Sequence, residues 1–488
     1  MKTQPNTSKF IMDIRLFFNN LKAIICLFCV LFTTFPYHSF SQSSPVQVRS
    51  IFGNGDNSDR YNAMVVDVSG NLLLGGYTYN TGKDKDYLVI KMTSSGSILW
   101  TRTYDGADNG SDKIFIMRTD PNGNVYVSGE CDGGGINQND IVTQKYSSSG
   151  TLLWSATYNS IYNQDDSPLD MEVDNAGNVF VVGSSDRDSS SLANNDDGIT
   201  LKYNSNGVLV FEARVNGSAN ATDRSSSVKP DNSGGCYVAG RTALSINDDA
   251  FLIRYSSTGT VLWQTNYDQG VLNNERAEAL AIDASGDIFV TGRATNLNDD
   301  VFLNKYSPSG ALIYNRIYNN LENDRVYYMR LDPAGNIYLL GQTDVLSGTG
   351  TNYNYMLLKY NTAGNLVWSR NYGSAVNNDE DPSGMAFDAA GSIFITGKSD
   401  VSTSGTVNDF LTVKYDSSGT FLWSHGFSGN ATISDDIPEA IAVVGNTIYV
   451  AGGSANLVTQ KDAAVFSLNQ FGAQQWIQQF NGQGDFTD

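Results

Sequence analysis

The sequence predicts an all-β fold, and three observations support this prediction. The chain of 488 residues contains one motif eight times, at intervals of about 54 residues. Each copy holds four short apolar runs, and glycine-bearing turns join the first run to the second and the third to the fourth. Gly, Ser, Asn, Asp and Tyr are plentiful, as expected for short strands and tight turns. Repetition at this spacing indicates units that pack side by side in one large fold.

The first element of the motif is an Asp-x-x-Gly turn followed by an apolar run that ends in glycine. DPNGNVYVSG at 120–129 is one copy, and its turn is expected to join two strands in a hairpin. VGNTIYVAGG at 444–453 is a degenerate eighth copy. The seven regular copies begin at Asp67, Asp120, Asp174, Asp231, Asp283, Asp332 and Asp388.

The second element is a glycine turn followed four residues later by a wide aromatic ring, as in SSSGTLLW at 147–154. Phe211 and Tyr314 hold the ring position in two copies. The other six copies place every tryptophan of the protein there: Trp100, Trp154, Trp263, Trp368, Trp423 and Trp476. A ring in the fourth strand can pack between neighbouring units and bury apolar area. We therefore predict that these tryptophans are structural wedges.

Four-stranded antiparallel units at this spacing predict the blades of a β-propeller. In the fifth repeat the strands are expected at 278–283, 287–291, 301–306 and 311–318. A stacked solenoid is the alternative, but its repeats are usually shorter or contain helix. Eight blades in one ring are favoured, with seven as the alternative. Residues 46–52 resemble one further fourth strand, and we expect them to compete with 473–480 for one edge.

Residues 1–41 are interpreted as a signal peptide. Arg15 and Lys22 precede an apolar run at 23–35. Ser39 and Ser41 are small residues that suit the positions before a cleavage site. The rest of the chain, 42–488, is expected to be the propeller domain, without a transmembrane segment, secreted or at the cell surface. The segment 481–488 resembles the start of another inter-blade loop, so a chain truncated at its C-terminus stays open.

Charge and cysteine content narrow the classes of partner and cross-link. The net charge is −20, and it becomes −23 without residues 1–41, which hold four basic residues and one acidic residue. This excess argues against nucleic acid and anionic membranes as partners. Cys131 and Cys236 fall in different repeats, so we expect no disulfide between them, and Cys236 lies in an apolar strand.

The stretch from 247–263 into 277–292 resembles the SBBP repeat, the "seven-bladed β-propeller" repeat of bacterial secreted and surface proteins. The matching elements are Asp249 before an apolar strand, the basic Arg254, a Ser-Ser-x-Gly turn and the Asp-x-x-Gly turn. The resemblance covers about residues 46–488. It implies a propeller fold and a bacterial secreted or cell-surface protein, and it brings no catalytic residues with it.

The residues that usually carry catalysis are scarce. His425 is the only histidine after residue 41, and we expect it at the surface. Neither a Ser-His-Asp set nor a zinc site with histidine can be assembled from one histidine. We therefore expect no enzyme activity. Chemistry that uses carboxylates alone, as in glycosidases, stays open.

Acidic residues recur at two fixed places in the repeat. The entrance series stands eleven residues before the first turn glycine: Asp59, Asp112, Asp166, Asp223, Glu275, Asp324 and Glu380. The third-strand series stands ten residues before the second turn glycine: Asp86, Asp140, Asp197, Asp249, Asp300, Asp409 and Asp462, with Asn354 in the remaining copy. Turn and strand capping by Asp is the plainer interpretation. No cofactor is expected, except that clustered carboxylates leave calcium open.

A basic residue follows five positions after the third-strand acids: Lys91, Lys145, Lys202, Arg254, Lys305, Lys359 and Lys414. We expect these residues to form ion pairs of small worth between strands or blades.

Both acidic series are expected on one face of the ring, with the entrance series nearer the axis. The longest loops, 184–197 and 343–354, open on the same face. The candidate ligand-binding residues, which are also the candidate calcium ligands, are Asp112, Asp166, Asp223, Glu275, Asp324, Asp249 and Asp300. We expect a partner that is cationic, polyhydroxylated or bridged by calcium.

The function favoured by the sequence is a binding or adhesion module for an extracellular glycan or protein. Two alternatives stay open: a secreted carboxylate-dependent hydrolase or lyase that acts on polysaccharide, and a structural spacer in a larger surface protein.

Overall fold

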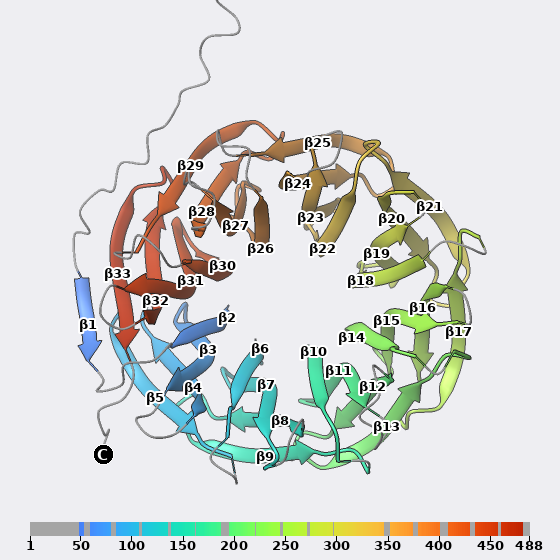
Figure 1. Ribbon diagram of the computed structural model, residues 1–488, viewed down its shortest axis with the longest axis horizontal. Helices are drawn as coiled ribbons and strands as arrows, with labels where there is room; N and C mark the ends of the chain where they lie inside the picture. The colour runs from blue at the N-terminus through green and yellow to red at the C-terminus, as the bar shows by residue number, and fades with distance from the viewer. Residues whose placement is uncertain are drawn as a thin grey trace, which may run out of the picture. The chain divides into compact units, whose positions relative to one another are not determined.

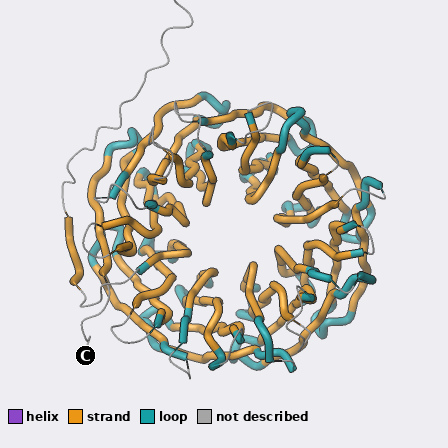
Figure 2. The backbone as a smooth tube through the Cα atoms, viewed as in Figure 1, coloured by secondary structure: helices purple, strands orange, loops and turns teal. Residues whose placement is uncertain are grey.

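The protein is an eight-bladed β-propeller, in which eight antiparallel sheets surround a central axis (Figure 1). The computed structural model describes residues 48–52, 59–79, 84–106, 110–134, 138–161, 163–186, 195–219, 221–244, 247–270, 274–295, 297–345, 352–373, 379–400, 408–429, 435–456 and 460–481. The proposed signal peptide lies outside these ranges. The described residues form 33 strands and no helix, hence no helix that could cross a membrane (Figure 2). The predicted fold class and the favoured blade number are confirmed.

Each blade consists of four consecutive strands, and the first strand is nearest the axis (Figure 1). The innermost strands are β2 (Arg60–Val66), β6 (Lys113–Thr119), β10 (Asp166–Val173), β14 (Arg224–Pro230), β18 (Asn274–Ile282), β22 (Asp324–Leu331), β26 (Glu380–Phe387) and β30 (Ile437–Val444). The second strands are β3 (Leu72–Tyr79), β7 (Val125–Asp132), β11 (Val179–Asp186), β15 (Cys236–Ala243), β19 (Ile288–Thr295), β23 (Ile337–Asp344), β27 (Ile393–Asp400) and β31 (Thr447–Asn456). The third strands are β4 (Lys85–Met92), β8 (Asn139–Tyr146), β12 (Asp196–Tyr203), β16 (Asp248–Tyr255), β20 (Asp299–Tyr306), β24 (Tyr353–Tyr360), β28 (Asn408–Tyr415) and β32 (Gln460–Asn469). The outermost strands are β5 (Ile98–Tyr104), β9 (Leu152–Tyr158), β13 (Leu209–Val215), β17 (Val261–Tyr267), β21 (Leu312–Tyr318), β25 (Leu366–Tyr372), β29 (Phe421–Phe427) and β33 (Gln474–Asn481). Blades are numbered 1 to 8 from β2–β5 to β30–β33.

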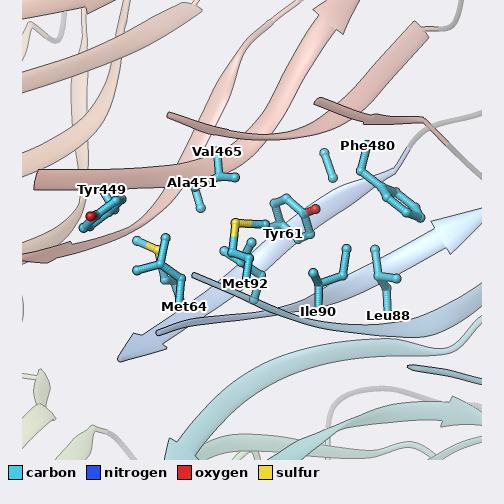
Figure 3. Close-up of a cluster of buried hydrophobic side chains, with 12 residues drawn as sticks. Tyr61, Met64, Leu88, Ile90, Met92, Tyr449, Ala451, Val465 and Phe480 are labelled. Atoms are coloured by element: carbon cyan, nitrogen blue, oxygen red, sulfur yellow. The ribbon is translucent and has the colours of Figure 1, made fainter. Parts of the chain in front are cut away.

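The ring closes by side-chain packing between blade 8 and blade 1. Tyr61 of β2 and Leu88 of β4 share one buried cluster with Tyr449 of β31 and Phe480 of β33 (Figure 3). Eight such clusters are present among the described residues, and each draws side chains from two neighbouring blades. The core is therefore divided among the junctions between blades.

The N-terminal strand β1 (Val48–Phe52) lies outside β33 and pairs with it in parallel, with Val48 opposite Ile477. Blade 8 is thus a sheet of five strands, in the order β1-β33-β32-β31-β30. The predicted competition for one edge is wrong. β33 pairs with β32 through one edge and offers the backbone groups of its other edge to β1, so both segments are accommodated.

The tryptophans act as wedges between blades, as predicted. The indole N–H of Trp100 donates a hydrogen bond to the carbonyl of Ser148 in the next blade, at 3.2 Å. Trp154 and Trp263 make the same bond to Ser205, at 3.1 Å, and to Pro308, at 3.2 Å. All six tryptophans are half-buried. Each ring therefore fills the outer part of a junction and keeps one edge in solvent.

The basic residues that follow the third-strand acids contact turns on the face opposite the two acidic series. The Nζ atom of Lys91 lies 2.8 Å from Oδ2 of Asp67, in the first turn of its own blade. Lys91 also donates to the carbonyl of Ser148, at 3.0 Å, which is the acceptor of Trp100. The equivalent Arg254 pairs with Asp231, at 2.9 Å. Among the described residues, the predicted ion pairs are present for Lys91, Arg254 and Lys305, each within its own blade. Lys202, Lys359 and Lys414 instead donate to backbone carbonyls, including carbonyls of the next blade.

The two cysteines and His425 belong to the packing between blades. Cys131 and Cys236 are buried free thiols. The His425 ring is half-buried, and its centroid lies 6.0 Å from that of Phe466 in blade 8. Burial lowers the pKa of His425. The predicted surface position is wrong, because the fourth strand of blade 7 places this residue at the junction with blade 8.

Candidate functional site: the mouth of the central channel

Every innermost strand carries an irregularity near its start. The register against the second strand shifts after the second, third or fourth residue in each of β2, β6, β10, β14, β18, β22, β26 and β30. The residues left between the paired positions are Asn62, Phe115, Leu169, Ser226, Glu278, Tyr327, Ser383 and Glu439. A bulge bends its strand and re-aims a side chain. Six residue types occupy these eight positions, so the bulges break the symmetry of the ring.

Three bulge residues line a cavity of about 260 Å³ at the start of the innermost strands of blades 3 to 5. We call it the arginine cavity. Its lining consists of Leu169, Arg224, Ser226, Arg241, Arg276, Glu278 and Arg293. Arg224 stands opposite Arg241 in the β14–β15 pair, and Arg276 stands opposite Arg293 in the β18–β19 pair. The strand pairing of two adjacent blades thus brings four guanidinium groups to one place.

Acidic neighbours hold these arginines in position. Oδ2 of Asp248 accepts hydrogen bonds from Nη1 of Arg241, at 2.8 Å, and from Nε of Arg276, at 3.1 Å. Arg293 has weaker contacts, with Nη1 at 3.5 Å from Asp299 and Nε at 4.0 Å from Glu278. Asp248 therefore bridges the second and innermost strands of neighbouring blades.

The arginine cavity has an excess of positive charge. Burial and the nearby Arg241 and Arg293 lower the pKa of Arg276. Glu278 is the only acid in the lining. Burial raises its pKa, although the charges of all four arginines of the lining act to lower it. Arg224 is exposed and has no ion-pair partner within the part of the chain that the structure describes. An anion placed here would relieve the repulsion among the arginines.

A second cavity, of about 240 Å³, lies across the mouth where blades 7, 8 and 1 meet. It contains Arg60, paired with Glu439, and Lys398, whose Nζ is 3.1 Å from Oδ2 of Asp381. Both bases of this lining are paired with acids, and Asp435 is a third acid, so the cavity lacks the positive excess of the arginine cavity.

The two predicted acidic series meet at the junctions between blades, on the side where the innermost strands begin. The backbone N–H of Asp112 donates to the carbonyl of Lys85, which precedes Asp86, at 2.6 Å. Asp223 makes the same bond to Asp196, which precedes Asp197, at 2.7 Å. The expectation of one shared face, with the entrance series nearer the axis, is confirmed (Figure 1).

The entrance acids join two backbone segments. Oδ2 of Asp112 accepts from the N–H of Gly106, at 2.6 Å, and Oδ1 accepts from Asp132 at the end of β7, at 3.2 Å. Asp223 bridges Gly217 and Ala243 in the same way. Of the seven candidate ligand-binding residues, Asp300 is half-buried and the other six are buried: Asp112, Asp166, Asp223, Glu275, Asp324 and Asp249. Their role in binding stays a prediction, and their burial limits direct contact to small species such as a proton or a metal ion.

Two sets of three carboxylates gather at these junctions. Asp86, Asp105 and Asp112 form one set, and Asp249, Asp268 and Glu275 form the other. In each set the carboxylate oxygens lie within 4.8 Å of one another. Of the other predicted residues, Asp166 lies near Asp140, and Asp324 lies near Asp300.

Sequence reasoning missed three features. The arginines of the cavity have a signal, since Arg224 and Arg276 directly follow an entrance acid and Arg241 and Arg293 directly follow the glycine that ends the second-strand motif. Asp436 is the eighth entrance acid, bonded to Gly429 and Ala455, but it stands only nine residues before Gly445. The bulges have no signal in the sequence. The central parts of the two long loops, 187–194 and 346–351, lie outside the described residues.

The strands define an eight-bladed propeller, and two cavities of unlike charge lie where its innermost strands begin. Comparisons with known proteins give the following similarities. No family model matches the chain. The chain is similar to an uncharacterised WD repeat-containing protein, L264, of Acanthamoeba polyphaga mimivirus, at 23% identity over 403 residues. This alignment covers 73% of the chain and 25% of the relative, so the chain spans about a quarter of that protein's length.

Two solved structures are similar to this chain at low sequence identity. The WD40 domain of SCAP from fission yeast has 11% identity and a TM-score of 0.44, over 85% of this chain and 96% of that one. The polysaccharide lyase Uly1 has 10% identity and a TM-score of 0.44, over 73% of this chain and 89% of that one. Neither likeness identifies a ligand or an activity for this chain.

The assignment to the SBBP repeat family is wrong, because no family model matches and the curated relative is a WD-repeat protein. The shared elements, an Asp-x-x-Gly turn and a Ser-Ser-x-Gly turn, are those that any hairpin of a four-stranded blade requires. These turns indicate the geometry of a blade and do not identify a family.

Proposed function

We propose that this propeller is a non-catalytic binding module that acts outside the cell and holds an acidic segment of a partner protein in the arginine cavity. The observation that carries the proposal is the group of four arginines around a cavity of about 260 Å³. The extracellular location rests on the interpretation of residues 1–41 alone.

Arginine suits carboxylate ligands because its planar guanidinium group donates two parallel hydrogen bonds to one carboxylate. The cavity is small, so it accommodates side chains rather than a folded domain. Leu169 is 41% exposed and lines the same cavity, which favours a peptide that carries an apolar residue beside its acids. The proposed partner therefore differs from the cationic one that net charge alone suggests.

The arginine cavity is positive and the whole chain is negative, and this contrast predicts how peptide binding depends on salt. The chain has a net charge of −20, which repels an acidic partner at long range. Attraction is confined to the short distance over which the arginines dominate. The Debye length is about 8 Å at physiological ionic strength, so salt screens the distant repulsion more than the contact between arginine and carboxylate. Added salt should therefore weaken binding less than it weakens a purely attractive ionic contact.

The two alternative functions have less support. A glycosidase-like mechanism uses two carboxylates that flank the scissile bond, and the arginine cavity has one acid in its lining, Glu278. A spacer requires no asymmetric charge at the channel mouth.

The test is a titration of a fluorescently labelled, glutamate-rich peptide followed by anisotropy. Arg224→Ala removes a guanidinium group that forms no ion pair among the described residues, so the fold is expected to survive. We expect binding to weaken about tenfold or more, since a hydrogen bond to a charged group contributes about 1.5–3 kcal/mol. Lys113→Ala is the matched control, because Lys113 follows an entrance acid in blade 2, away from the cavity.

Equal effects of the two substitutions would contradict the proposal. Polygalacturonate in the same assay tests the glycan alternative, and its binding in place of the peptide would replace a protein partner with an acidic polysaccharide. Release of shortened or unsaturated chains from that polymer would favour the hydrolase or lyase.

A further inference from the structure

We propose that the junction between blades 4 and 5 is a calcium-binding site formed by Asp249, Asp268 and Glu275. Asp249 lies near the start of β16, Asp268 directly follows β17, and Glu275 lies near the start of β18. The site is independent of the arginine cavity in its chemistry, and it would fasten two neighbouring blades.

The distances suit calcium. The three carboxylates place oxygens within 4.8 Å of one another. Calcium binds oxygen ligands at about 2.3–2.6 Å, so two ligands on opposite sides of the ion are about 4.6–5.2 Å apart. Magnesium binds at about 2.0–2.1 Å, requires nearly ideal octahedral geometry and usually keeps several waters, so a group of three protein carboxylates suits calcium better. Asp249 and Glu275 are buried while Asp268 is exposed, which leaves one side open for ion entry and for water ligands.

An unpartnered oxygen inside the cluster points to a ligand. Glu275 is fully buried, and its Oε1 accepts a hydrogen bond from the N–H of Gln269, at 3.2 Å. Its Oε2 atom is also buried and has no hydrogen-bond donor among the described residues. A buried carboxylate oxygen without a partner is costly, and such groups are normally paired or coordinated to a metal. Burial raises the pKa of Glu275, the bond from Gln269 opposes this shift, and the negative charges of Asp268 and Asp249 add to it.

The junction between blades 3 and 4 shows what the ion would replace. There Arg214 of β13 lies with Nη1 3.5 Å from Oδ2 of Asp197, the equivalent of Asp249. The residue at the position of Arg214 in blade 4 is Asn266, which contributes a hydrogen bond to Asp249 but no charge. The protein supplies a cation at one junction, and at the next the carboxylates remain without one.

The set Asp86, Asp105 and Asp112 provides an internal comparison. Its oxygens are as closely spaced as those of the other set. Both oxygens of Asp112 accept backbone hydrogen bonds, from Gly106 and Asp132. We therefore assign calcium to the set with Glu275 and use the set with Asp112 as its control.

The experiment measures calcium binding by the full chain with isothermal titration and with terbium luminescence. Asp268→Asn removes the exposed carboxylate and introduces the residue found at the equivalent positions Asn159, Asn216 and Asn319, so the variant is expected to fold. We expect a calcium site that magnesium does not occupy at equal concentration, and at least a tenfold loss of affinity in Asp268→Asn. Asp105→Asn, the matched control, is expected to retain the site.

Thermal melting gives a second measurement. We expect millimolar calcium to raise the melting temperature of the native chain and to have little effect on Asp268→Asn. Asn266→Arg, which introduces the built-in cation of the neighbouring junction, is expected to remove the calcium effect as well.

Three results would overturn the proposal: absence of calcium binding to the folded native chain, equal losses in Asp268→Asn and Asp105→Asn, or stabilisation of the junction by acid but not by calcium, which would mean that Glu275 holds a proton instead. Because the peptide titration relies on Arg224, either proposal can fail without the other.

Discussion

The ring of Trp263 in blade 4 lies directly against Gly310 in the second turn of blade 5. A Cβ atom at Gly310 would come within 2.9 Å of the ring atoms Cδ2 and Cε3. The φ angle of Gly310 is +85°, in the region that glycine adopts without strain. The two repeated elements of the sequence thus complete one contact, in which the aromatic ring of one blade requires the glycine of the next.

Replacement of Trp263 by Ala is expected to lower the free energy of unfolding by about 3 kcal/mol, the low end for such a change, because the ring is half-buried. Chemical denaturation monitored by circular dichroism measures the loss. Leu262, on the same strand and 52% exposed, is the matched control, and Leu262→Ala should change stability little. Equal stability of Trp263→Ala and the native chain would mean that the ring is not an inter-blade wedge.

Replacement of Gly310 by Ala should destabilise the protein more than replacement of Gly445 by Ala. Both glycines have positive φ angles, +85° and +58°, so both variants incur a left-handed cost of about 1–2 kcal/mol. Only Gly310 adds a clash, since nothing lies within 4 Å of a Cβ at Gly445. Denaturation midpoints of the two variants compare the costs. Similar midpoints would show that the Trp263 ring moves aside freely.

Without calcium, the stability of the ring should fall as the pH rises from about 5 to 8. Burial raises the pKa of Asp166 to about 7 and that of Asp324 to about 6, against about 3.9 for an unfolded Asp. A raised pKa means that the folded state binds more protons, so this stabilisation is complete below pH 4 and is lost as the pH rises through 6 to 7. The pKa of His425 is lowered, so this residue makes the stability rise with pH, but it is one group against several carboxylates.

Melting temperatures measured in a chelating buffer test this dependence. Asp166→Asn should make the pH profile flatter. Asp416→Asn, at an exposed turn whose serine Ser418 lowers the pKa of Asp416, should leave the profile between pH 5 and 8 unchanged. A profile that rises steadily over this range would rule out raised carboxyl pKa values as the dominant effect.

Replacement of Glu278 by Gln should strengthen the binding of an acidic peptide severalfold. Glu278 is the only acid in the lining of the arginine cavity, and its removal frees Arg293 for the ligand. Glu439 occupies the equivalent bulge in blade 8, so Glu439→Gln is the matched control and should leave the affinity unchanged. Weaker binding by Glu278→Gln in the anisotropy titration would place the acidic ligand elsewhere.

Much of the fold can be predicted from the sequence because it depends on local chemistry that repeats. The Asp-x-x-Gly and Ser-Ser-x-Gly turns fix hairpins through glycine conformation and short side-chain bonds, as in the bond from the N–H of Ser69 to Asp67, at 2.8 Å. Strands of the fifth repeat fall within a few residues of the expected ranges, as with β21 at Leu312–Tyr318. The place of Trp263 between blades follows from the same repetition.

The position of β1 and the location of the charged cavity depend on contacts between distant segments. The resemblance of 46–52 to a fourth strand predicts that it joins the blade of 473–480, but only the tertiary structure shows that it lies outside β33 and pairs with it. The same is true of the bulges at Leu169 and Glu278, which arise from a mismatch in length between paired strands.

The sequence by itself determined the all-β fold class, the number of repeats, the positions of the aromatic wedges and the common face of the two acidic series. Each of these depends on residues close together in the chain or on strict repetition. Tertiary structure alone decided which charges meet. Arg224, Arg276 and Asp248 come from different strands of two blades, and their separations depend on how those blades pack around the axis. Electrostatic energy varies with distance and with burial. The excess positive charge of the arginine cavity could therefore be recognised only from the closed ring.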